Sequence, residues 1–188
     1  EVIQLAAQSL KLISSDFVLE VSLLGLIEAM LSRACGDSLF GEKALGFIAE
    51  KNAHDLSRLC TEYNVSAADE KKLQLLITAY GERHAVISAL EGECAGKELD
   101  ELKALSKLLD LSPDSDKIRF DFSVVINMSY YNGFVFRGFL DGVCDGVLAG
   151  GQYDRLMAKM NRKSGAVGFA IYLDELEQLQ SSDSGFDI

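Results

Sequence analysis

Three short segments in the second half of the chain combine aromatic, glycine and polar residues of the types that form small-ligand sites. They are residues 130–136 (YYNGFVF), 149–156 (AGGQYDRL) and 165–171 (GAVGFAI). A glycine pair lets a ligand or a neighbouring backbone approach a strand closely. Phenolic hydroxyl groups on adjacent strands can point into one pocket and hydrogen-bond a small polar ring. An aromatic wall with a few polar tips is what a small amino-acid site needs.

Each of these features also has a purely structural interpretation. Adjacent tyrosines in a strand often pack in a core or at a sheet edge, a glycine pair often forms a turn or bulge, and Asp154 could simply cap a helix. His54 and His84 fall in a helical region, where surface or packing positions are expected. The four cysteines form no CxxC pair, so we expect no metal site and interpret them as small buried hydrophobic residues.

The composition limits the class of protein. Of the 188 residues 48% are hydrophobic and 25% charged, as in ordinary globular proteins, and the net charge is -11. Because nucleic-acid affinity depends on Lys and Arg, this charge argues against a broad phosphate-binding surface. Lys159, Arg162 and Lys163 form a local basic cluster, either a solvated turn or a phosphate site. No apolar run is long enough to span a bilayer, and a reduced, cytoplasmic protein is expected.

The first 112 residues show mainly helical periodicity. Ile3, Ala6, Leu10 and Ile13 share one helix face, and alternation from Phe17 to Ser22 predicts a short strand. From Leu24 the helical pattern resumes. Ser66 and Asp69 predict a capped helix start, and this helix is expected to place four residues on one face: Leu73, Leu76, Ile77 and Tyr80. A last helix with Leu99, Leu102, Leu105 and Leu109 is expected to end before Pro113, the only proline.

After Pro113 the periodicity becomes two, as in strands. We expect strands at residues 118–124, 133–140 and 147–149, the last running into Gly150-Gly151, then a buried strand at 166–173 and a short helix at 174–180. Half of the 16 glycines lie between Gly133 and Gly168. A helical block followed by antiparallel strands indicates an α+β fold. The tail from Ser181 is expected to be frayed.

Taken together, the three segments resemble the histidine-specific signatures of the histidyl-tRNA synthetase catalytic core. That family reads Arg-Gly-Leu-Asp-Tyr-Tyr-Thr with Val-Phe-Glu, then Gly-Gly-Arg-Tyr-Asp, then Gly-Phe-Ala-Ile-Gly-x-x-Arg-Leu. The resemblance implies a partial class II synthetase-like antiparallel sheet with an all-helical insert: residues 1–23 and 113–188 form the core and 24–112 the insert. It also implies that histidine is bound by Tyr130, Tyr131, Gly150, Gly151, Gln152 and Tyr153.

The chain departs from the family wherever an arginine is expected. Ile126 and Ser129 replace the Arg and Asp before the tyrosine pair, and Arg137 replaces the acidic residue after Val-Phe. Gln152 replaces the Arg of the second signature, and in the third Tyr172 replaces Gly and Glu175 replaces the Arg that clamps ATP. Activation by ATP develops negative charge that an arginine stabilises. We therefore expect no catalytic residues and no cofactor.

Loss of catalysis with retention of the tyrosines resembles the synthetase paralogue that is the regulatory subunit of ATP phosphoribosyltransferase. The resemblance implies a role in histidine biosynthesis, the short-form catalytic subunit as partner, histidine as effector, homo- and hetero-oligomers, and no role for tRNA. Two alternatives stay open: a divergent or fragmentary histidyl-tRNA synthetase, and a scaffold with a vestigial pocket. The first residue is not Met and the first two class II motifs are not visible, so we expect the sequence to start inside a larger protein.

Overall fold

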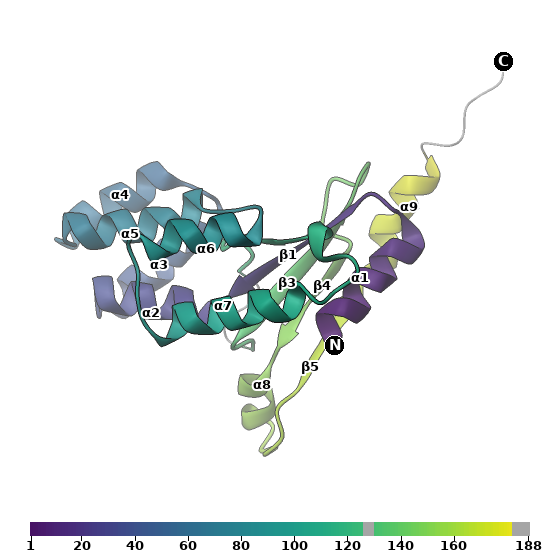
Figure 1. The fold of residues 1–188 in the computed structure, drawn as a ribbon. Coiled ribbons are helices and arrows are strands. Elements are labelled where there is room, and N and C mark those ends of the chain that lie inside the picture. The colour runs from purple at the N-terminus through teal and green to yellow at the C-terminus, as the bar shows by residue number, and fades with distance from the viewer. Residues whose placement is uncertain (126–129, 182–188) are drawn as a thin grey trace.

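The computed structural model describes residues 1–125 and 130–181 (Figure 1). Ile126 and Ser129, two of the positions at which the synthetase signature is lost, lie outside the described residues, as does the tail beyond Ser181. Helices gather at one end of the molecule and strands at the other, with helix α1 beside the strands (Figure 1).

The N-terminal helix and strand form as the sequence predicts. Helix α1 (Val2–Ile13) buries one stripe of residues, Ile3, Ala6, Ala7 and Leu10. Strand β1 (Phe17–Leu23) alternates buried and partly buried residues along its first half and becomes fully buried at its end. The chain therefore passes from helix to the middle of the sheet within a few residues.

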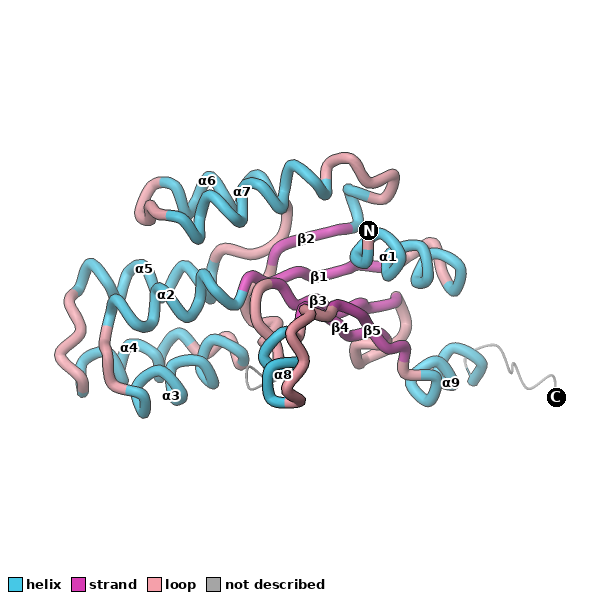
Figure 2. Tube along the Cα trace, turned by 90° about the horizontal axis from the view of Figure 1, so that it is seen from below, coloured by secondary structure: helices cyan, strands magenta, loops and turns pink. Residues whose placement is uncertain are grey.

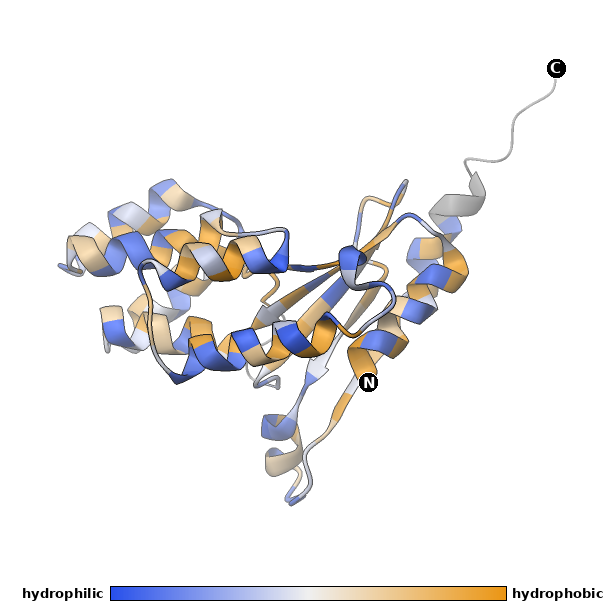
Figure 3. Cartoon of the chain, in the orientation of Figure 1, coloured by the Kyte–Doolittle hydropathy of each residue, from blue (hydrophilic) through white to orange (hydrophobic). Residues whose placement is uncertain are grey.

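A block of six helices follows β1. The helices are α2 (Leu24–Ala34), α3 (Ser38–Ala49), α4 (Ala53–Glu62), α5 (Ala67–Thr78), α6 (Arg83–Glu91) and α7 (Lys97–Leu109). Their sides carry alternating hydrophobic and hydrophilic stripes (Figure 3), which is the pattern of helices packed against one another on one side. Figure 2 shows three layers of paired helices, α6 with α7, α5 with α2, and α4 with α3. The helical periodicity of this region is thus confirmed.

Side-chain caps set the starts of four of these helices. Asp37, Asn52, Ser66 and Glu82 each accept a hydrogen bond from a backbone N–H of the first turn of α3, α4, α5 and α6 respectively. The predicted pairing of Ser66 with Asp69 is confirmed, since the Ser66 side chain accepts from the Asp69 N–H. Tyr80 was expected on the buried face of α5, but that helix ends at Thr78 and Tyr80 is 60% exposed. Its ring instead lies under the Lys51 ammonium group, 4.1 Å from the centroid.

The sheet has five strands in the order β2-β1-β3-β4-β5. The strands after β1 are β2 (Ile118–Phe120), β3 (Phe134–Leu140), β4 (Leu148–Gln152) and β5 (Val167–Ile171). The 3₁₀ turn η1 (Ser115–Lys117) precedes β2. Helix α8 (Asp154–Lys159) follows β4, and helix α9 (Leu173–Ser181) follows β5. β1, β3, β4 and β5 are antiparallel neighbours, whereas β2 runs parallel to β1. The expectation of an antiparallel sheet is therefore wrong for this one pair, and the sheet is mixed.

Three of the predicted strands need correction. β2 ends at Phe120 rather than at residue 124, because the Asp121 carboxylate accepts hydrogen bonds from the Ser123 backbone and hydroxyl and turns the chain. The strand expected at 147–149 extends through Gln152, so the glycine pair lies within β4 and not after it. β5 is not buried as expected, because it has only β4 as a neighbour and its residues are partly or fully exposed.

Two ion pairs connect the helical block to the sheet end. The Lys51 ammonium group lies 2.6 Å from the carboxylate of Asp121, whose side chain is only 3% exposed. Arg155 in α8 binds Glu28 in α2 through two hydrogen bonds of 2.7 and 2.9 Å. These contacts fix the block relative to the loops that precede β3 and follow β4. The division into residues 1–23, 24–112 and 113–188 stays a proposal.

Candidate aromatic ligand site

Tyr131 and Tyr153 meet beside strands β3 and β4. Their ring centroids are 5.9 Å apart and the ring planes cross at 81°, an edge-to-face arrangement. Tyr131 precedes β3, and Tyr153 follows β4 as the residue before the first turn of α8. The antiparallel pairing of β3 with β4 places these two residues, 22 positions apart in sequence, at the same end of the sheet.

Two glycines on neighbouring strands leave the space that these rings occupy. A Cβ atom added at Gly151 would lie 2.9 Å from a Tyr131 ring carbon, and one added at Gly168 would lie 2.7 Å from the Tyr153 hydroxyl oxygen. Gly151 and Gly168 are paired across β4 and β5, so they share one face of the sheet. Any larger residue at either position would displace a tyrosine ring.

The Tyr131 phenol is held in its neutral form. Burial raises its pKa above the ordinary value, and the nearby phenols of Tyr172 and Tyr153 raise it further. At neutral pH the hydroxyl group therefore keeps its proton and can donate a hydrogen bond. A neutral imidazole nitrogen is a suitable acceptor for such a donor. Recognition of a small polar ring is thus the chemistry that the tyrosine pair can perform.

The Gln152 side chain does not extend toward the tyrosine pair but forms a hydrogen-bond network with Asp154. Its amide nitrogen donates to the Asp154 carboxylate at 2.6 Å, and the other carboxylate oxygen accepts from the Ala166 N–H at 2.9 Å. Asn132 adds a long contact of 3.4 Å. The hydrogen bond from Gln152, with those from Ala166 and Asn132, lowers the pKa of Asp154. This network joins the start of β3, the end of β4 and the start of β5.

Two further predicted site residues lie away from the tyrosine pair. Gly150 faces the opposite side of the sheet, where an added Cβ would lie 2.8 Å from the Phe136 ring and 2.5 Å from the Phe169 Cβ. Tyr130 is 42% exposed, with the Lys159 ammonium group 5.5 Å above its ring. Of the six residues implied by the resemblance, the structure therefore brings Tyr131, Gly151 and Tyr153 into contact.

Four of the positions at which the chain departs from the synthetase signatures lie within the described residues: Arg137, Gln152, Tyr172 and Glu175. The Gln152 side chain donates a hydrogen bond to Asp154, and Arg155, the residue after Asp154, forms an ion pair with Glu28. Arg137 lies on β3 opposite Glu20 of β1 and Ala149 of β4. Glu175 occupies the first turn of α9, and Tyr172 directly precedes that helix. Among these described positions, no arginine stands beside the tyrosine pair where a phosphate group would need one.

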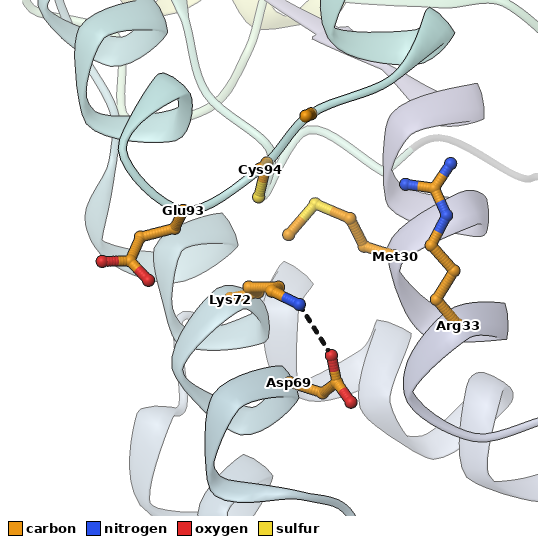
Figure 4. A pocket seen from close by; sticks show the side chains of 7 residues that line it. Met30, Arg33, Asp69, Lys72, Glu93 and Cys94 are labelled. Atoms are coloured by element: carbon orange, nitrogen blue, oxygen red, sulfur yellow. Dashed lines mark hydrogen bonds and ion pairs between the residues drawn. The ribbon is translucent and has the colours of Figure 1, made fainter.

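A separate cavity of about 210 Å³ lies inside the helical block. Figure 4 shows Met30 and Cys94 directed toward one another, with the Lys72 ammonium group bound to Asp69 at 2.9 Å. Arg33, on the same wall as Met30, is paired with Glu98 outside the cavity. Because Lys72 and Arg33 are each paired with a carboxylate of this chain, we do not assign this cavity as the ligand site.

The histidines and cysteines follow the structural interpretation only partly. His54 and His84 are exposed, as expected. Cys60 is buried, and burial raises the pKa of its thiol to about 11. Cys35 and Cys94 are only half-buried and Cys144 is exposed, so the expectation of four buried cysteines is wrong.

Within residues 1–125 and 130–181, no group of three or more His, Cys, Asp or Glu residues could hold a metal ion. The same residues contain no helix that is both long and apolar enough to cross a membrane.

Sequence reasoning missed three residues that shape the site. Gly168 lies under Tyr153, Tyr172 adds a third phenol near Tyr131, and Asn132 joins the Asp154 network. Gly168 was part of the third segment, so its alternation with Ala170 along a strand could have identified it. Asn132 was part of the first segment, but its contact with Asp154 and the approach of Tyr172 to Tyr131 depend on strand pairing, which no local pattern reveals.

Comparison with known proteins agrees with this architecture. A family model described as histidyl-tRNA synthetase matches residues 1–176. An ATP phosphoribosyltransferase regulatory subunit from Halalkalibacterium halodurans is 30% identical over 180 residues, which cover 94% of this chain and 45% of that protein. The solved structure of an ATP phosphoribosyltransferase regulatory subunit/histidyl-tRNA synthetase from Bacillus halodurans C has a TM-score of 0.85 and 29% identity, covering 95% of this chain and 48% of the other.

A more distant structure shows the same fold. The ATP phosphoribosyl transferase (HisG:HisZ) complex from Thermotoga maritima matches with a TM-score of 0.65 and 18% identity, covering 89% of this chain and 57% of that one. This chain spans about half the length of the curated relatives that it matches. The predicted α+β fold of the class II synthetase type is confirmed. Because the family model matches nearly all of its residues, the chain belongs to the histidyl-tRNA synthetase family.

Proposed function

We propose that this chain is part of a non-catalytic regulatory subunit of ATP phosphoribosyltransferase, which acts in the cytoplasm in histidine biosynthesis and binds histidine between Tyr131 and Tyr153. Relatives that carry the regulatory-subunit name match 94% of the chain, and this supports the role. The structural observation that carries the proposal is the tyrosine pair, which keeps ring-binding groups in contact while Gln152 is held by Asp154.

In this proposal the phenols recognise the imidazole ring. The neutral Tyr131 hydroxyl donates to one ring nitrogen, and the edge-to-face rings form the wall of the pocket. Gly151 and Gly168 leave room for the two tyrosine side chains that would contact the ligand. Because Gln152 and Glu175 stand where the synthetase signatures have arginines, bound histidine would not be activated by ATP, and its binding would serve as a signal.

Histidine binding can be measured by calorimetry on the intact protein. Tyr131→Phe and Tyr153→Phe should each weaken binding by about tenfold, the value of one or two neutral hydrogen bonds. Tyr80→Phe is a matched control, because Tyr80 lies in the helical block and its contact with Lys51 needs only the ring. If the intact protein binds no histidine, the pocket is vestigial and the scaffold alternative replaces sensing.

The regulatory role has a direct assay. Purified short-form catalytic subunit should transfer the phosphoribosyl group faster when the intact protein is added, and histidine should inhibit the mixture more strongly than the catalytic subunit alone. An unchanged rate and unchanged histidine sensitivity would reject the role.

The second candidate function is that of a histidyl-tRNA synthetase. This candidate is retained because the matching family model and the Bacillus halodurans structure both carry the name histidyl-tRNA synthetase. Histidine-dependent exchange of pyrophosphate into ATP distinguishes the two, because the regulatory proposal predicts none. Clear exchange by the intact protein would favour the enzyme.

A further inference from the structure

A groove on the outer side of the helical block lies between helices α2 and α3. It encloses about 370 Å³ and is lined by Glu28, Leu31, Ser32, Cys35, Gly36, Asp37, Ser38, Gly41, Glu42 and Leu45. Leu31 and Leu45 supply its large apolar side chains. Half of the lining residues are glycine, serine or cysteine, so a segment lying in the groove could approach the helix backbones closely.

The glycines of this groove are not required by the packing of the chain itself. A Cβ atom added at Gly36 or Gly41 would meet no heavy atom within 4 Å. Gly41 lies inside α3, where glycine weakens a helix relative to alanine. The space in front of Gly41 is therefore open, and the helix forgoes a better helix-forming residue at a position that faces the groove.

The charged residues that line the groove are acidic, and one of them, Glu28, is paired with a cation of helix α8. The lining contains three acidic residues, Glu28, Asp37 and Glu42, and no Lys, Arg or His. Arg155 pairs with Glu28 and the Asp37 side chain caps α3, whereas Glu42 forms no ion pair with any residue in the described part of the chain. An apolar floor with an acidic rim suits apolar side chains flanked by Lys or Arg.

We propose that this groove is the docking surface for a basic, amphipathic segment of the catalytic subunit, an assignment that rests on the function proposed above. The apolar side chains of that segment pack on Leu31 and Leu45, its backbone passes over Gly41, and its cations meet the acidic rim. A second copy of this chain suits the groove poorly, because each copy carries a net charge of -11.

Two leucine substitutions on the same helix separate docking from folding. Gly41→Leu fills the groove, whereas Gly46→Leu places the same side chain on α3 at an exposed position that does not line it. Both positions are open to an added Cβ, so neither variant should lower the melting temperature of the intact protein. By calorimetry with purified short-form catalytic subunit, Gly41→Leu should weaken binding at least tenfold and Gly46→Leu less than twofold.

A second pair of variants tests the charge. Glu42→Lys reverses a charge on the rim, and Glu50→Lys makes the same change at the other end of α3, away from the groove. Only Glu42→Lys should weaken binding, by at least fivefold at low salt, and the difference should shrink as sodium chloride is raised.

The outcomes distinguish the inference from the proposed function. If the wild-type protein does not bind the catalytic subunit, the proposed function fails and the docking assignment fails with it. If the wild type binds and both leucine variants bind equally well, the groove assignment alone is overturned. If Gly41→Leu instead alters sedimentation of the protein by itself, the groove is an interface between two copies, and the assignment to the catalytic subunit is rejected.

Discussion

The glycines of the sheet and the glycines of the helical block stand in opposite surroundings. At Gly138, Gly150 and Gly151 an added Cβ would meet neighbouring atoms closer than 3.0 Å, whereas at Gly25, Gly36, Gly41 and Gly46 it would meet none within 4 Å. In the sheet, glycine is therefore a packing requirement of this chain. At those four positions of the block it is not, whereas Gly81 and Gly96 of the same block have φ values of 110° and 134°, which favour glycine.

The same contrast separates the two candidate surfaces. The tyrosine pair is positioned by contacts within the chain, because each ring lies against a glycine, Tyr131 against Gly151 and Tyr153 against Gly168. The groove between α2 and α3 is open in front of Gly36 and Gly41, where an added Cβ would meet no heavy atom within 4 Å. A substitution in the sheet should thus act through stability, and a substitution in the groove should act through binding.

The largest effect is expected from Gly150→Ala. The methyl group would collide with the Gly168 carbonyl oxygen and the side chains of Phe136 and Phe169 inside the core. We expect a loss of about 3 kcal/mol in the free energy of unfolding, the upper part of the range for overpacked cores. Urea denaturation measures it. A loss below about 0.5 kcal/mol, within the usual range of surface substitutions, would show that β4 and β5 can separate cheaply.

Lys51→Met should have the next largest effect, because it breaks a link between the two regions. Asp121 would lose its cation while 3% exposed, although Lys51 itself is 39% exposed and partly screened by water. We expect a loss of about 2 kcal/mol, less than for a fully buried pair.

The control for that change is Lys71→Met. The Lys71–Glu93 pair joins an exposed lysine to a partly exposed glutamate within the block, and its loss should cost less than about 0.5 kcal/mol. Equal losses of unfolding free energy for the two variants would mean that the connection to Asp121 is no stronger than a surface pair.

Gly46→Ala should change stability in the opposite direction. Its Cβ enters open space within α3, so the helix gains propensity without a collision. A gain of about 0.5 to 1 kcal/mol is expected in the free energy of unfolding. A lower melting temperature for Gly46→Ala than for the wild type would contradict the distinction between the two sets of glycines.

The smallest effect is expected from the titration of Asp154, and it changes the stability of the protein only at acidic pH. The Asp154 pKa is lowered in the folded protein by Gln152, Ala166 and Asn132, so its contribution to stability is present above the unfolded pKa and is lost as the pH falls through the folded value. Asp154→Asn lacks this titration. Below about pH 4 the wild type should lose stability more steeply than the variant. Urea midpoints from pH 7 to pH 3 test this, and parallel curves would reject it.

The sequence predicted the regular elements well and their surroundings less well. Local patterns suffice for β1, for the cap at Ser66 and for β3, because each depends on residues close in the chain. The exposure of β5 and the parallel direction of β2 depend on which strands become neighbours. Tyr80 was misplaced because a helical pattern continues past the residue at which the hydrogen bonds of α5 end.

The candidate site was predicted in outline and not in detail. Signature spacing identified Tyr131, Gly151 and Tyr153, which meet in the structure. Gly150 was included because the resembled signature contains both glycines, but successive residues of a strand face opposite sides of a sheet. The actual partner of Gln152 lies two residues away, and only side-chain geometry shows that its amide turns to Asp154.

The parallel pairing of β1 with β2 has a consequence for the order of folding. Leu19 and its partner Ile118 are separated by roughly a hundred residues, so closing this contact in an unfolded chain carries a large entropic cost. If α2 to α7 condense first, the contact joins the ends of an already compact body. We therefore expect β2 to dock late, so that Ile118→Val accelerates unfolding and leaves the refolding rate nearly unchanged in stopped-flow measurements.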